Sequence, residues 1–134
     1  MRVFLDANVL FTAAASPDRK SAYLVGNARR AGITLVSCSL AVEEADRNLK
    51  AKFPGRSARL GELLAMVEIA PTAVAGKCPI RLPEKDVPIF LSALKAGATR
   101  LLTGDIKDFG PFMNNPRRTG GIVIQSVSDF LRSL

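Results

Sequence analysis

The sequence of 134 residues has no histidine and no tryptophan, and it contains only two cysteines, Cys38 and Cys78. Without histidine it cannot form a serine-hydrolase triad, an acid–base pair of the ribonuclease A kind or a histidine-based zinc site. The two cysteines have neither the number for a disulfide framework nor the spacing of metal ligands, so we expect both to be reduced in a cytoplasmic protein. No apolar run reaches the ~18 residues of a membrane span, and Asp6 interrupts any signal-peptide core.

Negative charge is also scarce, with 12 Asp and Glu against 19 Lys and Arg and a formal net charge of +7. A surface of this charge attracts polyanions such as nucleic acids. Charge alone leaves the partner open, because many soluble proteins are basic without binding nucleic acid. The length and the 48% of hydrophobic residues predict a single domain, residues 1–134, with a real core.

Short apolar segments alternate with amphipathic segments along the whole chain. We expect strands at 2–5, 33–36, 67–70, 100–103 and 122–124, and helices at 9–15, 21–30, 39–50, 56–66 and 84–96. A last helix follows the capping box that starts at Ser126. The segments 71–83 and 104–116 are expected to be loops. This alternation predicts an α/β fold whose parallel sheet is covered by helices on both faces.

Acidic residues stand where these strands end or helices begin. Asp6 follows the first strand, Asp105 follows the strand 100–103, and Asp86 lies in the first turn of the helix 84–96. In an open parallel sheet, ligands bind outside the carboxyl ends of the strands. Each acid also has a purely structural explanation, as a helix cap, a partner of the helix dipole or a turn residue.

The helix 39–50 carries two neighbouring acids, Glu43 and Glu44, which periodicity barely separates. Carboxylates gathered at one edge repel each other and acquire raised pKa values. A hard divalent cation removes that conflict because it prefers oxygen ligands. Such an ion also lowers the pKa of a bound water and stabilises charge on a scissile phosphate, which is chemistry that needs no histidine.

With these acids in their contexts, the chain resembles the PIN-domain ribonucleases, a family that includes PilT N-terminus domains and the VapC-like toxins of toxin–antitoxin pairs. The matching segments are 3–10, 39–49, 84–94 and 101–109. The resemblance implies a three-layer α/β/α fold with a parallel sheet in the order 3-2-1-4-5. It also implies a Mg²⁺- or Mn²⁺-dependent endoribonuclease, with an RNA substrate and an antitoxin protein as partners.

The same resemblance assigns the site residues. It places Asp6, Glu44, Asp86 and Asp105 as catalytic metal ligands, with Asp108 as a fifth acid and with Asn8 and Thr103 as polar residues that orient them. It also selects Glu44 over Glu43.

Three other protein classes share parts of this pattern. A phosphotransfer enzyme of the haloacid-dehalogenase type needs a second Asp two residues after Asp6, where this chain has Asn8. A nucleotide-binding Rossmann domain needs a glycine-rich turn at the same place. An inert PIN-like module that binds RNA or protein remains as the alternative, although four mutually repelling acids argue against a mere scaffold.

Two surfaces are predicted from the remaining residues. A basic cluster is expected to guide the phosphate backbone rather than to be a merely solvated face, and it comprises Arg47, Lys50, Lys52, Arg56 and Arg59. Phe53, Phe109 and Phe112 are candidates for stacking on bases. The apolar helices 9–15 and 60–67 exceed what one thin domain hides, which together with the family habit of pairing predicts a symmetric homodimer.

Overall fold

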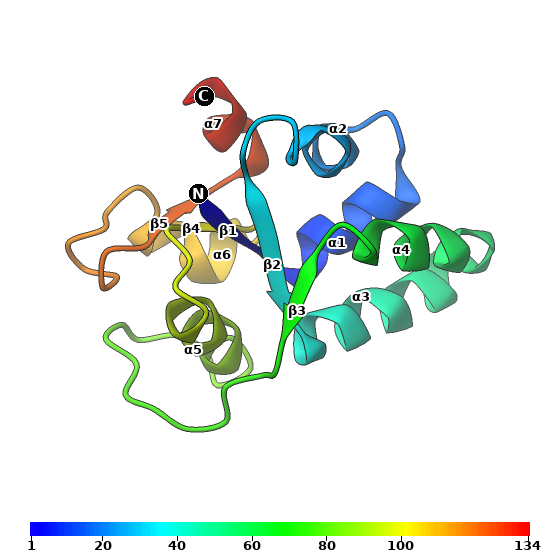
Figure 1. The fold of residues 1–134 in the computed structure, drawn as a ribbon. Coiled ribbons are helices and arrows are strands. Elements are labelled where there is room, and N and C mark those ends of the chain that lie inside the picture. The colour runs from blue at the N-terminus through cyan, green and yellow to red at the C-terminus, as the bar shows by residue number, and fades with distance from the viewer.

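The computed structural model describes residues 1–134 and alternates strands with helices along the chain (Figure 1). The strands are β1 (Arg2–Leu5), β2 (Thr34–Cys38), β3 (Glu68–Ala70), β4 (Arg100–Leu102) and β5 (Val123–Gln125). The helices are α1 (Ala7–Ala15), α2 (Lys20–Asn27), α3 (Ser39–Lys52), α4 (Ser57–Leu64), α5 (Val87–Lys95), α6 (Ile106–Phe109) and α7 (Val127–Arg132), with short 3₁₀ helices η1 (Pro54–Arg56) and η2 (Gly110–Phe112). None of the helices is long and apolar enough to span a membrane.

All the predicted strands and helices are present, but two predictions need correction. The segment 104–116 is not simply a loop, because it contains α6 and η2. The helix predicted at 84–96 starts only at Val87, since Pro88 has no N–H to donate and is tolerated only in the first turn. Asp86 is therefore the N-cap of α5 and not a residue of its first turn.

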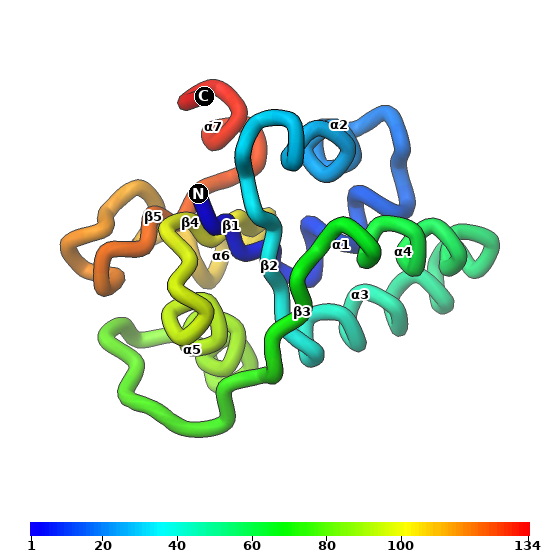
Figure 2. Tube along the Cα trace, in the orientation of Figure 1, coloured from blue at the N-terminus to red at the C-terminus, as the bar shows by residue number.

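The five strands form one parallel sheet in the order β3-β2-β1-β4-β5, which confirms the predicted order. The chain moves outward from β1 to β3 and then crosses back to place β4 on the other side of β1. Figure 2 shows the long connection from β3 to α5 that begins this crossing. The strand order thus reverses between β1 and β4, and parallel sheets bind ligands at the carboxyl ends of strands at such a point.

The sheet is covered on both faces, as predicted. Figure 1 shows α5 on one side of the sheet and α1, α2 and α7 on the opposite side. Because the central strands meet helices on both faces, their residues are apolar without alternation. Val3, Phe4 and Leu5 of β1 are fully buried, and so are Leu101 and Leu102 of β4. This rigid central pair carries the residues that follow it at the carboxyl edge.

The apolar faces of α1 and α4 are packed within one chain and do not provide the predicted surface for a second copy. Helix α1 packs against α2, α3 and α4 within the same chain. That packing buries Leu60 and Leu63 of α4 to 3% and 8% exposure, and Val67 after it to 8%. The apolar content of α1 and α4 is therefore used inside one molecule and gives no support to a homodimer.

Candidate metal centre

The first site residue, Asp6, lies directly after β1 and is the N-cap of α1. It is only 5% exposed. One carboxylate oxygen accepts a hydrogen bond from the backbone N–H of Ala7 at 2.7 Å, and the other accepts from the hydroxyl of Thr103 at 2.8 Å. The Asp6 side chain therefore both caps α1 and belongs to the site, and the capping hydrogen bond holds its carboxylate in place.

Thr103 links β1 to β4 at the point where the strand order reverses. The register pairs Leu5 with Leu102, so the residues that follow them, Asp6 and Thr103, lie side by side. The buried Thr103 hydroxyl also accepts a hydrogen bond from the backbone N–H of Asp105 at 3.0 Å. Asn8 completes the link, because its side-chain oxygen accepts from the N–H of Gly104 at 2.7 Å. Thr103 is thus hydrogen-bonded to Asp6 and Asp105, and Asn8 fixes the turn between Thr103 and Asp105.

The second group of acids comes from the turn between β4 and α6. Asp105 is the N-cap of α6, and its carboxylate accepts a hydrogen bond from the N–H of Asp108 at 3.0 Å. This cap holds both side chains at the start of one helical turn. The side chain of Asp108 also lies 3.9 Å from the ammonium of Lys85, measured from Oδ2 to Nζ.

Asp86 approaches the same place from the N-cap of α5, and it is only 9% exposed. Its Oδ2 atom is buried and has no hydrogen-bond partner within the chain. Burial raises the pKa of Asp86 to about 7, and the proximity of Asp108 and then Asp105 adds to the rise. A buried carboxylate oxygen without a partner is an unusual feature that a bound cation would satisfy.

The fourth element is α3, which presents Glu44 to the site. Glu44 is half-buried and lines the cavity, whereas Glu43 is exposed and does not. The structure therefore separates the two residues that periodicity could not. Glu44 also helps to raise the pKa of Asp6, whose rise is caused first by burial and is opposed by its hydrogen bonds to Thr103 and Ala7.

These elements enclose a cavity of about 260 Å³, which we call the acidic cavity. Its lining residues are Asp6, Ala7, Asn8, Phe11, Glu44, Asn48, Lys52, Lys85, Asp86 and Asp105. The four predicted acids thus meet in one place although they are far apart in sequence. Asp108 lies outside this lining.

The donor set fits a hard divalent cation. Oxygen atoms of Asp86, Asp105 and Asp108 all lie within 4.8 Å of one another. Only carboxylates contribute to this group, and Mg²⁺ and Mn²⁺ prefer such ligands. The fifth acid of the prediction therefore belongs to the tightest cluster, while Asp6 and Glu44 lie further around the cavity wall.

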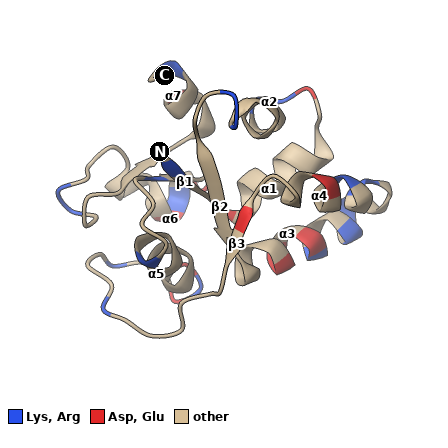
Figure 3. Ribbon diagram, in the orientation of Figure 1, with Lys and Arg blue, Asp and Glu red and all other residues tan.

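The predicted basic cluster is only partly free to meet a ligand. Figure 3 shows Lys and Arg gathered where α3 ends and α4 begins. Lys52 lines the acidic cavity, but Lys50 forms an ion pair with Asp46 at 2.9 Å. Arg59 differs most from its prediction, because its guanidinium donates hydrogen bonds of 2.9 and 3.2 Å to the carbonyls of Ala14 and Ala13 at the end of α1.

The stacking candidates are also reduced. Phe109 and Phe112 are buried in the core at 0% and 6% exposure, so neither can meet a base. Phe53 remains, at 48% exposure. Its ring centroid lies 6.0 Å from that of Phe11, and the Lys52 ammonium lies 5.6 Å from the centroid of Phe11.

Besides Ala7, which adjoins Asp6, three residues of the acidic cavity were not predicted, namely Phe11, Asn48 and Lys85. Helical spacing was the signal that could have found the first two. Asn48 lies four residues after Glu44 on α3, and Phe11 lies three residues after Asn8 on α1. Lys85 directly precedes Asp86, and nothing in its local pattern marks it.

The sequence matches no protein-family model and no curated protein. Solved structures do match it. VapBC2 from Rickettsia felis, in a structure bound to a DNA fragment from its promoter, matches with a TM-score of 0.65 and 17% identity, over 94% of this chain and 98% of that one. A PilT N-terminus domain protein from Sulfolobus solfataricus P2 matches with a TM-score of 0.61 and 13% identity, over 99% and 92%.

VapC20 from Mycobacterium tuberculosis, described as a sarcin-ricin loop cleaving toxin, matches with a TM-score of 0.59 and 11% identity, over 82% of this chain and 95% of that one. Structural matches at identities this low establish the fold only, and the activity has to be argued from the site. The strand order and the layers agree with this likeness. The chain therefore has the PIN-domain fold that its sequence resemblance predicted.

Proposed function

We propose that this protein is a metal-dependent endoribonuclease that hydrolyses the phosphodiester bonds of RNA. One observation supports the proposal above all others. Acids from four separate elements converge on one cavity at the switch point of the sheet, and one of them has a buried oxygen without a partner. Such a cluster is unfavourable in isolation, so the fold retains a repulsion that a cation would relieve.

Asp86, Asp105 and Asp108 would hold the ion, with Asp6 and Glu44 completing the acidic wall. When bound, Mg²⁺ or Mn²⁺ supplies a water of lowered pKa and stabilises charge on the phosphate.

The chain's own residues perform the positioning. The Thr103 hydroxyl and the Ala7 N–H hold the Asp6 carboxylate in one orientation before any substrate arrives. At neutral pH, Asp86 retains a proton for part of the time because its pKa is near 7. That proton must leave when a cation takes its place, so affinity for the metal should rise with pH.

Single-stranded RNA is the substrate that the rim of the cavity favours. Lys52 and Lys85 line the wall and attract a phosphate backbone towards the acids. Phe53 offers an exposed ring beside Phe11, and aromatic rings of this kind stack on unpaired bases. Arg47 and Arg56 are exposed on the same part of the chain and extend the positive surface.

The structural neighbours extend the proposal to a biological role. One neighbour is described as a toxin that cleaves the sarcin-ricin loop, and another was solved as a VapBC assembly. By analogy, we include a toxin role and an antitoxin protein as partner in the proposal. The proposal also keeps the cytoplasmic location and the homodimer that the sequence predicted.

The test is RNA cleavage by the purified protein with Mg²⁺, with Mn²⁺ and with EDTA. We expect cleavage with either ion and none with EDTA. Asp6→Asn should abolish cleavage while preserving the fold, because it removes one charge from a repelling cluster. Glu44→Gln should lower activity strongly. Glu43→Gln is its matched control, because Glu43 directly precedes Glu44 on the same helix and its side chain is exposed.

Three results would contradict the proposal. Activity that persists in EDTA excludes the metal mechanism, and equal loss from Glu43→Gln and Glu44→Gln excludes the assignment of Glu44. RNA binding without cleavage under any metal would favour the inert PIN-like binding module instead.

A further inference from the structure

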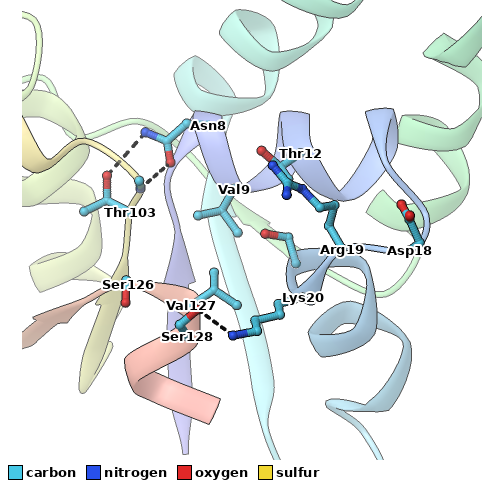
Figure 4. A pocket seen from close by; sticks show the side chains of 12 residues that line it. Asn8, Val9, Thr12, Asp18, Arg19, Lys20, Thr103, Ser126, Val127 and Ser128 are labelled. Atoms are coloured by element: carbon cyan, nitrogen blue, oxygen red, sulfur yellow. Dashed lines mark hydrogen bonds between the residues drawn. The ribbon is translucent and has the colours of Figure 1, made fainter. Parts of the chain in front are cut away.

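A second and larger cavity opens beside the acidic one, with a volume of about 660 Å³ (Figure 4). We call it the α2 pocket, because the start of α2 forms part of its wall. Its lining comes from α1, the turn before α2, the residues after β4 and the start of α7. These residues are Asn8, Val9, Thr12, Asp18, Arg19, Lys20, Ser21, Thr103, Gly104, Ser126, Val127 and Ser128.

The α2 pocket adjoins the acidic cavity, because Asn8 lines both. The side-chain oxygen of Asn8 is fixed by the N–H of Gly104, so this residue forms a firm boundary between the two spaces. Figure 4 shows Asn8 and Thr103 at one end of the pocket and Asp18 at the other. A polymer that lies across the acidic cavity can thus continue past Asn8 into the pocket.

The cations of the α2 pocket are not neutralised by acids. Arg19 and Lys20 are exposed, and neither takes part in any of the chain's four ion pairs. The ammonium of Lys20 donates a hydrogen bond to the Ser128 hydroxyl at 3.0 Å, which holds it across the pocket (Figure 4). An anion placed here would meet two positive charges, and Asp18 would repel it only at the far end.

The start of α2 adds hydrogen-bond donors. Arg19 is the N-cap residue, and its side chain makes no capping hydrogen bond, so the first N–H groups of this eight-residue helix lack a side-chain partner. Ser21 lines the pocket and is only 7% exposed, and its hydroxyl has no hydrogen-bond partner within the chain. Free N–H groups at a helix start bind phosphate, and a hydroxyl without a partner in the chain is free to bind a ligand.

We infer that the α2 pocket is the subsite for the phosphate and ribose of an RNA nucleotide that flanks the scissile bond. This inference rests on the proposed function, because it takes the acidic cavity as the place of cleavage. The two cations and the N–H groups of α2 bind phosphate oxygens, while the hydroxyls of Thr12, Ser21 and Ser128 bind the ribose.

The composition of the wall identifies which part of the nucleotide is bound. Only two lining residues, Val9 and Val127, are hydrophobic, and none is aromatic. A base would need a stacking surface, which is absent here and present on the other side at Phe53. The subsite therefore recognises the backbone of RNA and contributes affinity independently of sequence.

The test measures RNA binding without cleavage. Asp6→Asn protein serves as the background, and a fluorescein-labelled single-stranded oligoribonucleotide of mixed sequence is the probe, titrated at several KCl concentrations. The pocket variant is Arg19→Gln/Lys20→Gln. Its matched control is Arg29→Gln/Arg30→Gln, which removes the same charge from two adjacent exposed residues just after α2.

We expect the pocket variant to weaken binding and to flatten the log–log salt slope by about 1.4, since each lost phosphate contact on a single strand contributes about 0.7. The control should leave the slope unchanged. Asp18→Asn should strengthen binding, because it removes the one acid of the pocket, whereas Glu62→Gln on the exposed face of α4 should not.

An unchanged slope for Arg19→Gln/Lys20→Gln would overturn the inference and assign these cations to the carboxylates of a protein partner or to solvent. If the wild-type protein cleaves RNA while the pocket variant binds RNA normally, the subsite inference is contradicted and the proposed nuclease activity is supported. If the pocket variant loses RNA binding but the wild type never cleaves RNA, the proposed nuclease activity is contradicted and the contact between the pocket and the RNA backbone is supported.

Discussion

Replacing Asp86 with Asn should stabilise the metal-free protein at neutral pH and abolish binding of a cation at the candidate centre. Asp86 is buried, and its Oδ2 has no hydrogen-bond partner. Burial and the neighbouring Asp108 and Asp105 raise its pKa from the usual 3.8 to about 7. The charged form is therefore unfavourable in the folded state, and the neutral amide of the variant avoids that penalty while it can donate to the neighbouring carboxylates.

The sign of the pH dependence follows from the direction of this shift. A carboxyl whose pKa rises on folding holds its proton more tightly in the folded state, so stability is lost as pH increases towards the folded pKa. Because the chain has no histidine, no side chain with an ordinary pKa titrates between about pH 5 and pH 7. Over that interval, the shift of Asp86 alone predicts a loss of about 2 kcal/mol.

Burial raises the pKa of Asp6 as well, so its loss of stability adds in the same direction. The protons of this cluster belong to several interacting carboxyls, and the slope reports on the cluster as a whole.

Urea unfolding in EDTA across this pH range is the assay. The wild type should lose stability with rising pH, and Asp86→Asn should lose less and exceed the wild type near neutrality. Glu43→Gln, with its exposed side chain, is the control and should follow the wild type. Adding Mg²⁺ at neutral pH should stabilise the wild type and leave Asp86→Asn unchanged. A wild-type stability that stays constant or rises between about pH 5 and pH 7 would refute the reasoning.

Three other predictions follow from the contacts around the site. Thr103→Val should lower stability by about 2–3 kcal/mol and remove most of the activity, because its buried hydroxyl donates to Asp6 and accepts from the Asp105 N–H. Its control is Thr119→Val, at a buried threonine away from the acids, which should lower stability but leave cleavage by the folded protein intact. Arg59→Gln should lower stability by about 1–2 kcal/mol in urea unfolding, since its guanidinium caps the end of α1, and unchanged unfolding would contradict that role. Arg47→Gln/Arg56→Gln should flatten the salt slope of RNA binding by up to about 1.4, and an unaltered slope would make these residues a solvated face.

The central part of the fold was predictable because its signals are local. The apolar run of β1 ends at an acid that caps the next helix, and the segment from β4 to α6 repeats this arrangement. Parallel strands share one carboxyl edge, so two such acids meet without any further information. Asp6 and Asp105 could thus be placed from the sequence pattern, and Glu44 required the family resemblance.

The incorrect predictions about surface residues concern contacts between distant segments. The local sequence predicts an exposed cation at Arg59. Only the packing of α4 on α1 shows that it donates to the carbonyls of Ala13 and Ala14. The same packing hides the apolar face that suggested a dimer. The α2 pocket was not predicted at all, because it requires Lys20 to meet Ser128 across 108 residues of sequence. No periodicity within a segment carries such information.

The hydrogen bond from Thr103 to Asp6 spans 97 residues and joins the residues that follow two neighbouring strands, β1 and β4. The complete acidic centre therefore requires β1 and β4 to be paired. A growing chain that has not yet supplied β4 contains Asp6 and Glu44 without Thr103, Asp105 and Asp108. Separation of β1 from β4 would break the contact between Asp6 and Thr103, so this one strand pair links the integrity of the sheet to that of the acidic centre.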